Sequence, residues 1–387
     1  MGGAEMSEWQ KVKFLDVVQL NPRISLVKGE KYPFVEMNNA PAGARNPEKD
    51  VFQIYTGGGA KFEKGDTVIA RIEPCLQNGK GFQSKYDKGF GSTEFLVFRP
   101  ISDKVISYDY LYYFMGQKSI RDAMAKTMVG ASGRQRVNNA FFNSISIKIP
   151  SLSVQCRIAE ILSRYDSLIE NYQRQIKLLE EAAQRLYKEW FVDLHFPGHE
   201  NTPIIDGIPE GWEKKTLDEF CNIFTGKKNA NACETDGMYY FFTCGDRPLL
   251  INTYIYDGPA IIISGNGSYT GRTTFYEGKF DLYQRTYACT SNKKHNSIFI
   301  YGLYEIVKDS LRKSISGGTH GAAIPYIVMS DITKFSFLFH PIVLEEFSLR
   351  MRTKLHMIQI IKNKINFLAE ARDRLLPKLM SGEIDVV

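Results

Sequence analysis

The chain has 387 residues, of which 43% are hydrophobic and 24% charged, and its formal net charge is +6. This length predicts two or three domains, and the small basic excess is compatible with a polyanionic partner without requiring one. No run approaches the ~18 apolar residues of a membrane span and the N-terminus has no apolar leader, so we expect a cytoplasmic protein. Six scattered cysteines lack CxxC spacing, which predicts reduced, buried thiols.

Residues 1–148 are predicted to form a first globule of mixed α+β structure. Runs at 66–72 and 93–98 are rich in β-branched and aromatic side chains and follow glycines, which is typical of short strands. Residues 108–124 place apolar side chains on one face, which indicates a helix.

A long helix is predicted at 149–191. Its apolar side chains recur at alternating steps of three and four residues, the pattern of a coiled-coil seam rather than of the wider stripe that packs on a globule. The turn residues at 196–198 are expected to end it. The two heptad sets are Leu162, Ile169, Ile176, Ala183 and Trp190, and Tyr165, Tyr172, Leu179 and Leu186.

Residues 199–339 are predicted to form a second α+β globule. A buried strand is expected at 259–263, followed by a turn-rich loop at 264–271. A second long helix is expected in 340–387, with Arg372 interrupting its seam and Pro377 ending or kinking it. Its seam positions are Ile358, Ile361, Ile365, Leu368, Leu375 and Leu379.

The two halves of the chain echo each other, because each couples a glycine-punctuated globule to a long helix. The first helix leads from one globule to the next and the second leaves the second globule, so we expect them to pack antiparallel. A helix of ~35 residues spans ~50 Å and would act as a ruler. The alternative is that each helix packs only on its own globule. The starts of the two globules are also similar in sequence: Glu8-Trp9 followed by Leu15-Asp16 in the first resembles Gly211-Trp212 followed by Leu217-Asp218 in the second.

Catalytic motifs are not found in the sequence. The glycine-rich loop at 265–271 has neither GxGxxG spacing nor a GK[ST] ending. His195 and His199 flank a turn and lack helical metal-ligand spacing, so we predict no metal site.

Two loop clusters of arginine, lysine and amide side chains, at 134–139 and 227–231, are the strongest candidates for binding. Arginine pairs with guanine and asparagine or glutamine with adenine in bidentate fashion, while lysine holds phosphates. The alternative is that each cluster is only a solvated loop. The candidate DNA-contacting residues are Arg45, Lys80, Arg134, Gln135, Arg136, Asn138, Asn139, Lys227, Lys228, Asn229, Asn231, Asn266, Ser268, Tyr269 and Arg272.

Several motifs occur together along almost the whole chain. They are residues 62–66, 71–80 and 91–100; Ile149-Pro150, Gln155, Ile158 and Ile161-Leu162; residues 190–193 and 196–198; and residues 207–212, 260–263 and 375–384. This combination resembles the specificity (S) subunit of type I restriction-modification systems.

The resemblance implies a fold and a division of labour. It implies target-recognition domains at 1–148 and 199–339, a central helical spacer at 149–198 and a C-terminal spacer at 340–387. The expected fold is therefore α+β, with two recognition domains joined by two long helices packed as an antiparallel coiled coil with pseudo-twofold symmetry.

The resemblance also implies partners. Each recognition domain would read one half of a split, asymmetric site in double-stranded DNA. Two modification (M) subunits would supply S-adenosylmethionine for adenine methylation, and restriction (R) subunits, where they exist, would supply ATP- and Mg²⁺-dependent cleavage. The chain itself would bind no cofactor, perform no chemistry and contact no membrane.

Two other classes of protein remain open from the sequence. One is a duplicated, stand-alone DNA-binding regulator, which would bind DNA tightly without partners. The other is a coiled-coil scaffold linking two protein-binding domains, which would ignore DNA.

Overall fold

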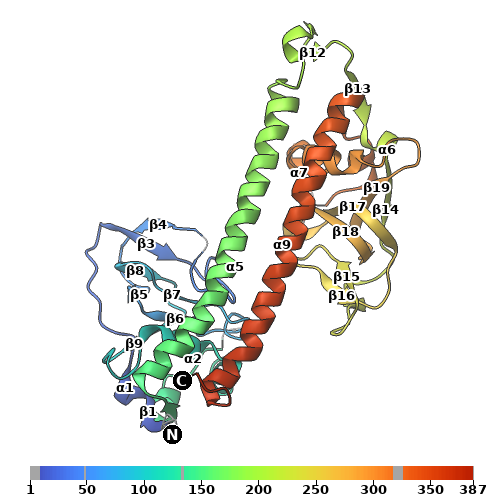
Figure 1. Ribbon diagram of the computed structural model, residues 1–387. Helices are drawn as coiled ribbons and strands as arrows, with labels where there is room; N and C mark the ends of the chain where they lie inside the picture. The colour runs from blue at the N-terminus through green and yellow to red at the C-terminus, as the bar shows by residue number, and fades with distance from the viewer. Residues whose placement is uncertain (1–8, 48, 132–134, 317–325, 387) are drawn as a thin grey trace, which may run out of the picture. The chain divides into compact units, whose positions relative to one another are not determined.

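The structure is a computed structural model that describes residues 9–47, 49–131, 135–316 and 326–386, the side chains at 309 and 312–316 excepted. The chain forms two compact units. Unit 1 contains Met1–Gln173 and Asn363–Val387, and unit 2 contains Arg174–Lys362. The helices α5 (Leu152–Tyr187) and α9 (Pro341–Ser381) therefore contribute turns to both units (Figure 1). Within the described ranges, no helix is long and apolar enough to cross a membrane.

Unit 1 combines two small sheets with short helices. One sheet has the order β2-β9-β6-β7 and the other β4-β3-β8-β5, while β1 pairs antiparallel with β10. The elements are β1 (Gln10–Lys13), α1 (Phe14–Val17), β2 (Val18–Leu20), β3 (Lys31–Val35), β4 (Phe52–Ile54), β5 (Ala60–Glu63), β6 (Thr67–Ala70), β7 (Gly81–Gln83), β8 (Lys88–Gly91), β9 (Phe95–Pro100), α2 (Tyr108–Gly116), α3 (Lys118–Ala125), α4 (Phe141–Ser144) and β10 (Ser146–Ile149).

The core of unit 1 draws on both ends of its sequence. Phe14 packs within 6.0 Å of Phe98 and 5.6 Å of Phe142, measured between ring centroids. Leu162 of α5 and Leu379 of α9 belong to the same buried cluster. The core is therefore incomplete without turns of both long helices.

Unit 2 is built around a sheet with the order β14-β19-β17-β18-β15-β16. Its β13 pairs antiparallel with β20, as β1 pairs with β10 in unit 1. The elements are η2 (His199–Asn201), β11 (Ile204–Ile205), β12 (Ile208–Pro209), β13 (Glu213–Thr216), α6 (Leu217–Phe220), β14 (Cys221–Thr225), η3 (Ala230–Ala232), β15 (Tyr239–Phe242), β16 (Leu249–Ile251), β17 (Tyr256–Ser264), η4 (Gly267–Tyr269), β18 (Thr273–Leu282), β19 (Thr286–Ser291), α7 (Phe299–Ser316), α8 (Met329–Thr333) and β20 (Ser336–Phe339).

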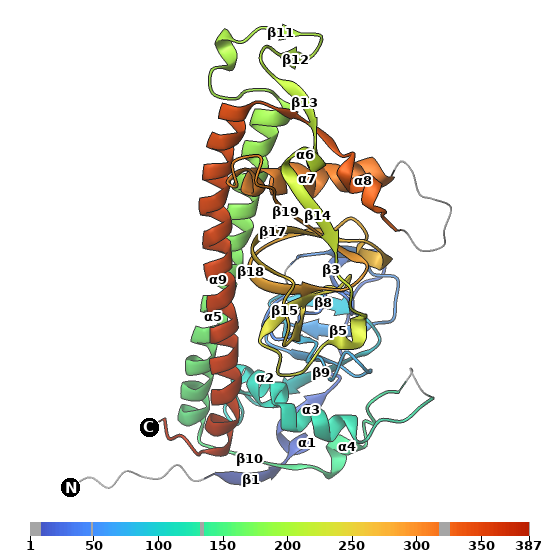
Figure 2. The ribbon, with the colours of Figure 1, turned by 90° about the vertical axis from the view of Figure 1, so that its right-hand side faces the viewer.

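The long hairpin of β17 and β18 curves strongly (Figure 2). Gly258 and Gly278 face each other in its register, and both have φ of +138°, a conformation that favours glycine. The paired glycines permit the backbone of both strands to bend at this position. The end of β18 at Leu282 then lies against Gly226, which follows β14.

The predicted strands are confirmed, since 66–72 and 93–98 contain β6 and most of β9, and 259–263 lies inside β17. The single helix predicted at 108–124 is wrong. It is broken at Gln117, whose backbone is extended (ψ 136°), so that α2 ends at Gly116 and α3 starts anew.

The ends of the long helices also differ from the prediction. α5 ends at Tyr187 and continues as one π-helical turn, η1 (Lys188–Val192), before Leu194 adopts a positive φ of 60°. The chain thus leaves the helix ahead of Phe196. Pro377 neither ends nor breaks α9, which runs on to Ser381, because Leu379 and Met380 are buried in the core of unit 1 and hold the last turn.

The two helices run antiparallel in each unit. In unit 1, Arg372 contacts Asp166 while the earlier Lys364 lies 5.6 Å over the ring of the later Tyr172. In unit 2, Trp190 packs on Phe347 with a centroid separation of 5.8 Å. The predicted antiparallel pairing is confirmed. Among the predicted seam residues, Leu162, Ile169, Ile358 and Ile361 are buried, and Ile176, Leu179, Leu186, Ile365, Leu368 and Leu375 are partly buried.

A buried ion pair crosses the helix pair in unit 1. Arg372 Nη1 donates to Asp166 Oδ1 at 2.6 Å and to the carbonyl of Gly43 at 2.7 Å. Tyr113 Oη donates to the other oxygen of Asp166 at 2.5 Å. Burial and the neighbouring Asp166 carboxylate raise the pKa of Tyr113, which keeps this hydroxyl a donor. Arg372, which interrupts the apolar seam in the sequence, thus links α9 to α5 directly. Through Asp166 and Tyr113 it also links α9 to α2.

The expectation of uniformly buried thiols is wrong. Cys221 and Cys289 are buried, whereas Cys156 and Cys233 are exposed. Burial raises the pKa of Cys221 to about 12, so its thiol stays protonated.

Replacing Arg372 should destabilise unit 1 far more than replacing a neighbouring arginine. Arg372→Met leaves the Asp166 carboxylate, whose side chain is 4% exposed, without its charged partner, and we expect a loss of about 3–5 kcal/mol. Arg374→Met is the matched control, because Arg374 is 79% exposed and its partner among the described residues is Glu370 on its own helix, a contact worth less than about 1 kcal/mol. Urea unfolding followed by circular dichroism measures both. Equal losses in the two variants would contradict this role for Arg372.

Candidate nucleic-acid interface

Four loops converge at one end of the sheet of unit 2. They are residues 226–231, 243–247, 265–272 and 283–285, which we call the unit 2 loop cluster. Gln284 N donates to Lys228 O, Gly265 N donates to Arg285 O, and both distances are 2.9 Å. The cluster contains five basic residues and one acidic residue, so it offers a positively charged surface for a polyanion.

Lys228 is anchored within this cluster. Its Nζ lies 3.2 Å from Asp281 Oδ2 and also contacts Thr253 Oγ1. The Asp281 side chain is 6% exposed and accepts a further bond from Leu282 N at 2.8 Å. The charge of Lys228 therefore neutralises a buried carboxylate, whereas the neighbouring Lys227 is exposed.

Arg272 is also held by the protein. Nη1 donates to Asp246 Oδ1 at 3.0 Å and Nη2 donates to Gly245 O at 2.6 Å. The guanidinium lies 4.5 Å from the ring centroid of Tyr269, which is itself exposed. These contacts join the loops after β15 and β17 and present the Tyr269 ring at the surface, where aromatic rings can pack on sugars or bases.

The predicted amide and hydroxyl side chains of unit 2 divide into two groups. Asn229, Asn231 and Ser268 are exposed, as base-contacting side chains must be. Asn266 instead forms an isolated β-bridge with Tyr326 and is partly buried.

In unit 1, the loop that contains Arg136 is tied to the turn before β9. Arg136 Nε donates to Glu94 Oε2 at 2.8 Å, and this hydrogen bond holds the pKa of Glu94 below its usual range. Asn138 Oδ1 accepts from Ala140 N at 3.0 Å, which caps the following turn. Asn139 is exposed and Gln135 is partly buried. The predicted candidate Arg134, like Glu8 of the sequence echo, lies outside the described residues.

Arg45 and Lys80 have structural contacts in a different part of unit 1. Arg45 Nε donates to Gln83 Oε1 at 2.7 Å, and its Nη2 also reaches Asp109. Lys80 Nζ donates to the carbonyl of Met37 at 2.8 Å. The structure therefore does not bring these two predicted residues together with Arg136.

Sequence reasoning missed several basic residues that the fold brings to these surfaces. Arg247 and Arg285 belong to the unit 2 loop cluster. In unit 1, Arg23, Lys61 and Arg71 line one cleft. They are far apart in the chain, so no local cluster marks them. Of these residues, Arg71 alone lies in one of the motifs found in the sequence, since it is the first residue of the motif at 71–80.

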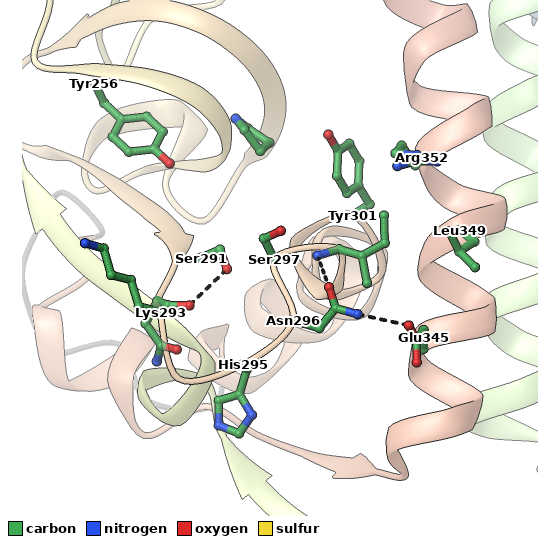
Figure 3. A pocket seen from close by; sticks show the side chains of 13 residues that line it. Tyr256, Ser291, Lys293, His295, Asn296, Ser297, Tyr301, Glu345, Leu349 and Arg352 are labelled. Atoms are coloured by element: carbon green, nitrogen blue, oxygen red, sulfur yellow. Dashed lines mark hydrogen bonds between the residues drawn. The ribbon is translucent and has the colours of Figure 1, made fainter.

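A separate pocket in unit 2 lies between α7, α9 and the chain after β19 (Figure 3). Asn296 Nδ2 donates to Glu345 Oε1 at 2.9 Å, and Asn296 Oδ1 accepts from Ile298 N at 3.1 Å. Asn296 thus caps the start of α7 and ties it to α9. Lining residues Ser291 and Tyr256 stand at the opposite ends of β19 and β17 from the loop cluster, so the pocket is a separate feature.

No group of three or more His, Cys, Asp or Glu side chains that could hold a metal ion occurs in the part of the chain that the structure describes. His195 and His199 have ring centroids 5.0 Å apart, and His199 Nδ1 lies 2.9 Å from the carbonyl oxygen of Phe196.

The arrangement defines a class of protein: two α+β units, each with basic loops, that share two long antiparallel helices. A family described as the type I restriction modification DNA specificity domain matches residues 6–181 and 209–339. The chain belongs to this family.

Individual relatives agree with the assignment. The MjaIX specificity subunit of Methanocaldococcus jannaschii is 29% identical over 73% of this chain and 70% of its own length. The EcoDI specificity subunit of Escherichia coli is 36% identical over 33% of this chain, but over only 28% of its own length. The crystal structure of an S subunit from M. genitalium has a similar fold, with a TM-score of 0.61, 15% identity and 98% coverage of both chains.

Lys227 and Lys228 should have separable roles despite being neighbours. Lys228→Met removes the charged partner of buried Asp281, and we expect a loss of about 1–3 kcal/mol in the free energy of unfolding. Lys227→Met should leave stability unchanged. Instead, it should reduce the slope of log Kd for DNA against log salt by up to about one unit, as loss of one phosphate contact does. Urea unfolding and DNA binding at several salt concentrations measure the two effects, and a reversal of the two phenotypes would refute the assignment.

Proposed function

We propose that this chain is the DNA-recognition subunit of a type I restriction-modification complex. It reads a bipartite, asymmetric site and positions the catalytic subunits, while performing no chemistry itself. The observation that carries the proposal is the presence of basic loops on both α+β units of a family member, with different residues in each unit.

Different loops imply different half-sites. Arg136, Asn138 and Asn139 of unit 1 and Lys227, Asn229 and Asn231 of unit 2 combine cations for phosphates with amides for base edges. We assign the recognition domains to residues 1–148 and 199–339, and the helical spacers to 149–198 and 340–387. A recognition domain that reads its own half-site gives the complex an asymmetric target.

The proposed partners are double-stranded DNA, two modification subunits and, where present, restriction subunits. S-adenosylmethionine, ATP and Mg²⁺ would act through those partners, in the cytoplasm. The target adenine would have to leave the duplex to reach a methyltransferase site, so assembly should distort the DNA.

The decisive experiment expresses this chain together with its modification subunit and sequences the methylated genome. We expect methylated adenines within a single split motif, and no such motif when this chain is omitted. A stand-alone regulator would bind DNA tightly without the modification subunit and give no motif. A scaffold would bind protein partners and ignore DNA.

Arg136→Ala should change the recognised sequence in one half of the motif only. The reason is that Arg136 and Glu94 lie in unit 1, whereas the other basic loops belong to unit 2. Selection from a randomised split-site library, with modification subunits present, measures preference in both halves. Lys227→Ala is the companion variant in unit 2, and a change in both halves on loss of Arg136 would disprove one unit per half-site.

The helices should set the distance between the half-sites. Deleting one heptad from each, residues 169–175 and 358–364, preserves the phase of the apolar positions and shortens each helix by ~10 Å. We expect the spacer between the half-sites to shrink, or methylation to be lost. Deleting a heptad from only one helix is the control, since it should disrupt the pairing. An unchanged motif and spacer after the paired deletion would show that the helices do not act as a ruler.

A further inference from the structure

The cleft of unit 1 that holds Arg23, Lys61 and Arg71 is a second basic feature, separate from the local loop clusters. It lies between the chain after β2, the start of β5 and the end of β6. The volume of this cleft is about 540 Å³, within the ~300–1,000 Å³ of ligand sites.

The charges of the cleft are of one sign. Arg23, Lys61 and Arg71 are cations, and none of the described residues that line the cleft carries a carboxylate. The nearby Glu94, next to the lining residue Thr93, is already engaged by Arg136. A cavity with three cations and no internal anion attracts a negatively charged ligand.

Arg71 is positioned rather than free to move. Its backbone N donates to Glu94 O at 2.9 Å, and its carbonyl accepts from Val137 N at 2.9 Å. Its Nη2 donates to Val137 O at 3.1 Å. Its Nε is buried and has no hydrogen-bond partner among the described residues, so the protein leaves the guanidinium incompletely paired.

The other two cations differ in how firmly they are held. Lys61 Nζ lies 5.4 Å from the ring centroid of Tyr55, which restrains it, whereas Arg23 is exposed. Gly59 gives the backbone beside Lys61 a positive φ of 74°, and an added Cβ there would lie 2.5 Å from Gly91 O. The cleft wall therefore requires a residue without a side chain.

The cleft adjoins the candidate recognition loop. Ile72 forms an isolated β-bridge with Arg136, and Val129 pairs with the same residue. Arg71 thus lines the cleft and is also hydrogen-bonded, through Val137, to the segment that carries Arg136, Asn138 and Asn139. DNA bound at these residues would therefore lie beside the cleft.

Resting on the proposed function, we propose that Arg23, Lys61 and Arg71 form a phosphate site that holds one backbone phosphodiester of the DNA beside the half-site read by unit 1. Arginine and lysine are the side chains that bind phosphates most strongly, through paired hydrogen bonds and charge. The site contributes affinity and fixes register without reading bases.

The test uses the complex of the chain with its modification subunits and a double variant, Arg23→Gln with Lys61→Gln. Arg71 is left intact because it also supports Val137. DNA binding is measured across salt concentrations with a cognate and an unrelated duplex. We expect both affinities to fall by the same factor, the slope of log Kd against log salt to drop by about one unit, and the methylated motif to stay the same. Lys11→Gln with Lys148→Gln, a cross-strand pair on β1 and β10, is the control of equal charge and should leave the slope unchanged.

Methylphosphonate substitution locates the contact. A neutral linkage placed at successive backbone positions should weaken binding of the unmodified protein at one position beside the half-site, and this loss should vanish in the double variant. A loss of the same size in both proteins, or an unchanged salt slope, overturns the phosphate site. If circular dichroism shows that the double variant is unfolded, Lys61→Gln alone is compared in the same scan, under the same criteria.

Two further outcomes separate the possibilities. If inorganic phosphate raises the melting temperature of the unmodified chain but not of the variant, and DNA binding is the same in both, the ligand is a free anion and the DNA assignment is wrong. If the unmodified complex yields a split methylated motif while the cleft variants behave normally, only the phosphate site fails. If it yields no motif and binds no DNA, the proposed function fails.

Discussion

The buried contact of Arg372 with Asp166 fixes how two segments 206 residues apart in sequence meet in unit 1. Apolar side chains along a helix pair can slide by a turn at modest cost, whereas a buried arginine satisfies its carboxylate in one register only. Tyr113 and Gly43 complete the same network, so the position of α2 and of the segment leading to Arg45 follows from it. The arrangement of α2 and of the segment before Arg45 therefore depends on one buried ion pair.

The cations of the candidate interface are mostly paired before any ligand arrives. Arg136 binds Glu94, Lys228 binds Asp281 and Arg272 binds Asp246. These ion pairs hold the loops in one arrangement, so less conformational entropy is lost when DNA binds. They also limit the free charge to residues such as Lys227 and Arg23, which are exposed.

Sequence patterns predicted the long helices because heptad periodicity is a local property that survives in any fold. They failed at Gln117, where the backbone is extended and the helix breaks, and at Pro377, where the burial of Leu379 and Met380 holds the last turn. The loop containing Arg136 was predicted because its polar residues are adjacent in sequence. The cleft of Arg23, Lys61 and Arg71 could not be predicted from the sequence, since three strands must form before these residues become neighbours.

Unit 1 is discontinuous, and this affects the order in which the protein can be made. Leu379 and Met380 belong to its core, yet they leave the ribosome only after all of unit 2 has been synthesised. Part of the apolar surface of the first unit therefore stays exposed to solvent while unit 2 is translated. A premature stop codon shortly before residue 363 would leave the sequence of unit 2 nearly complete but would remove the last segment of unit 1. The incomplete first unit is then the part of the protein that chaperones and proteases are expected to bind.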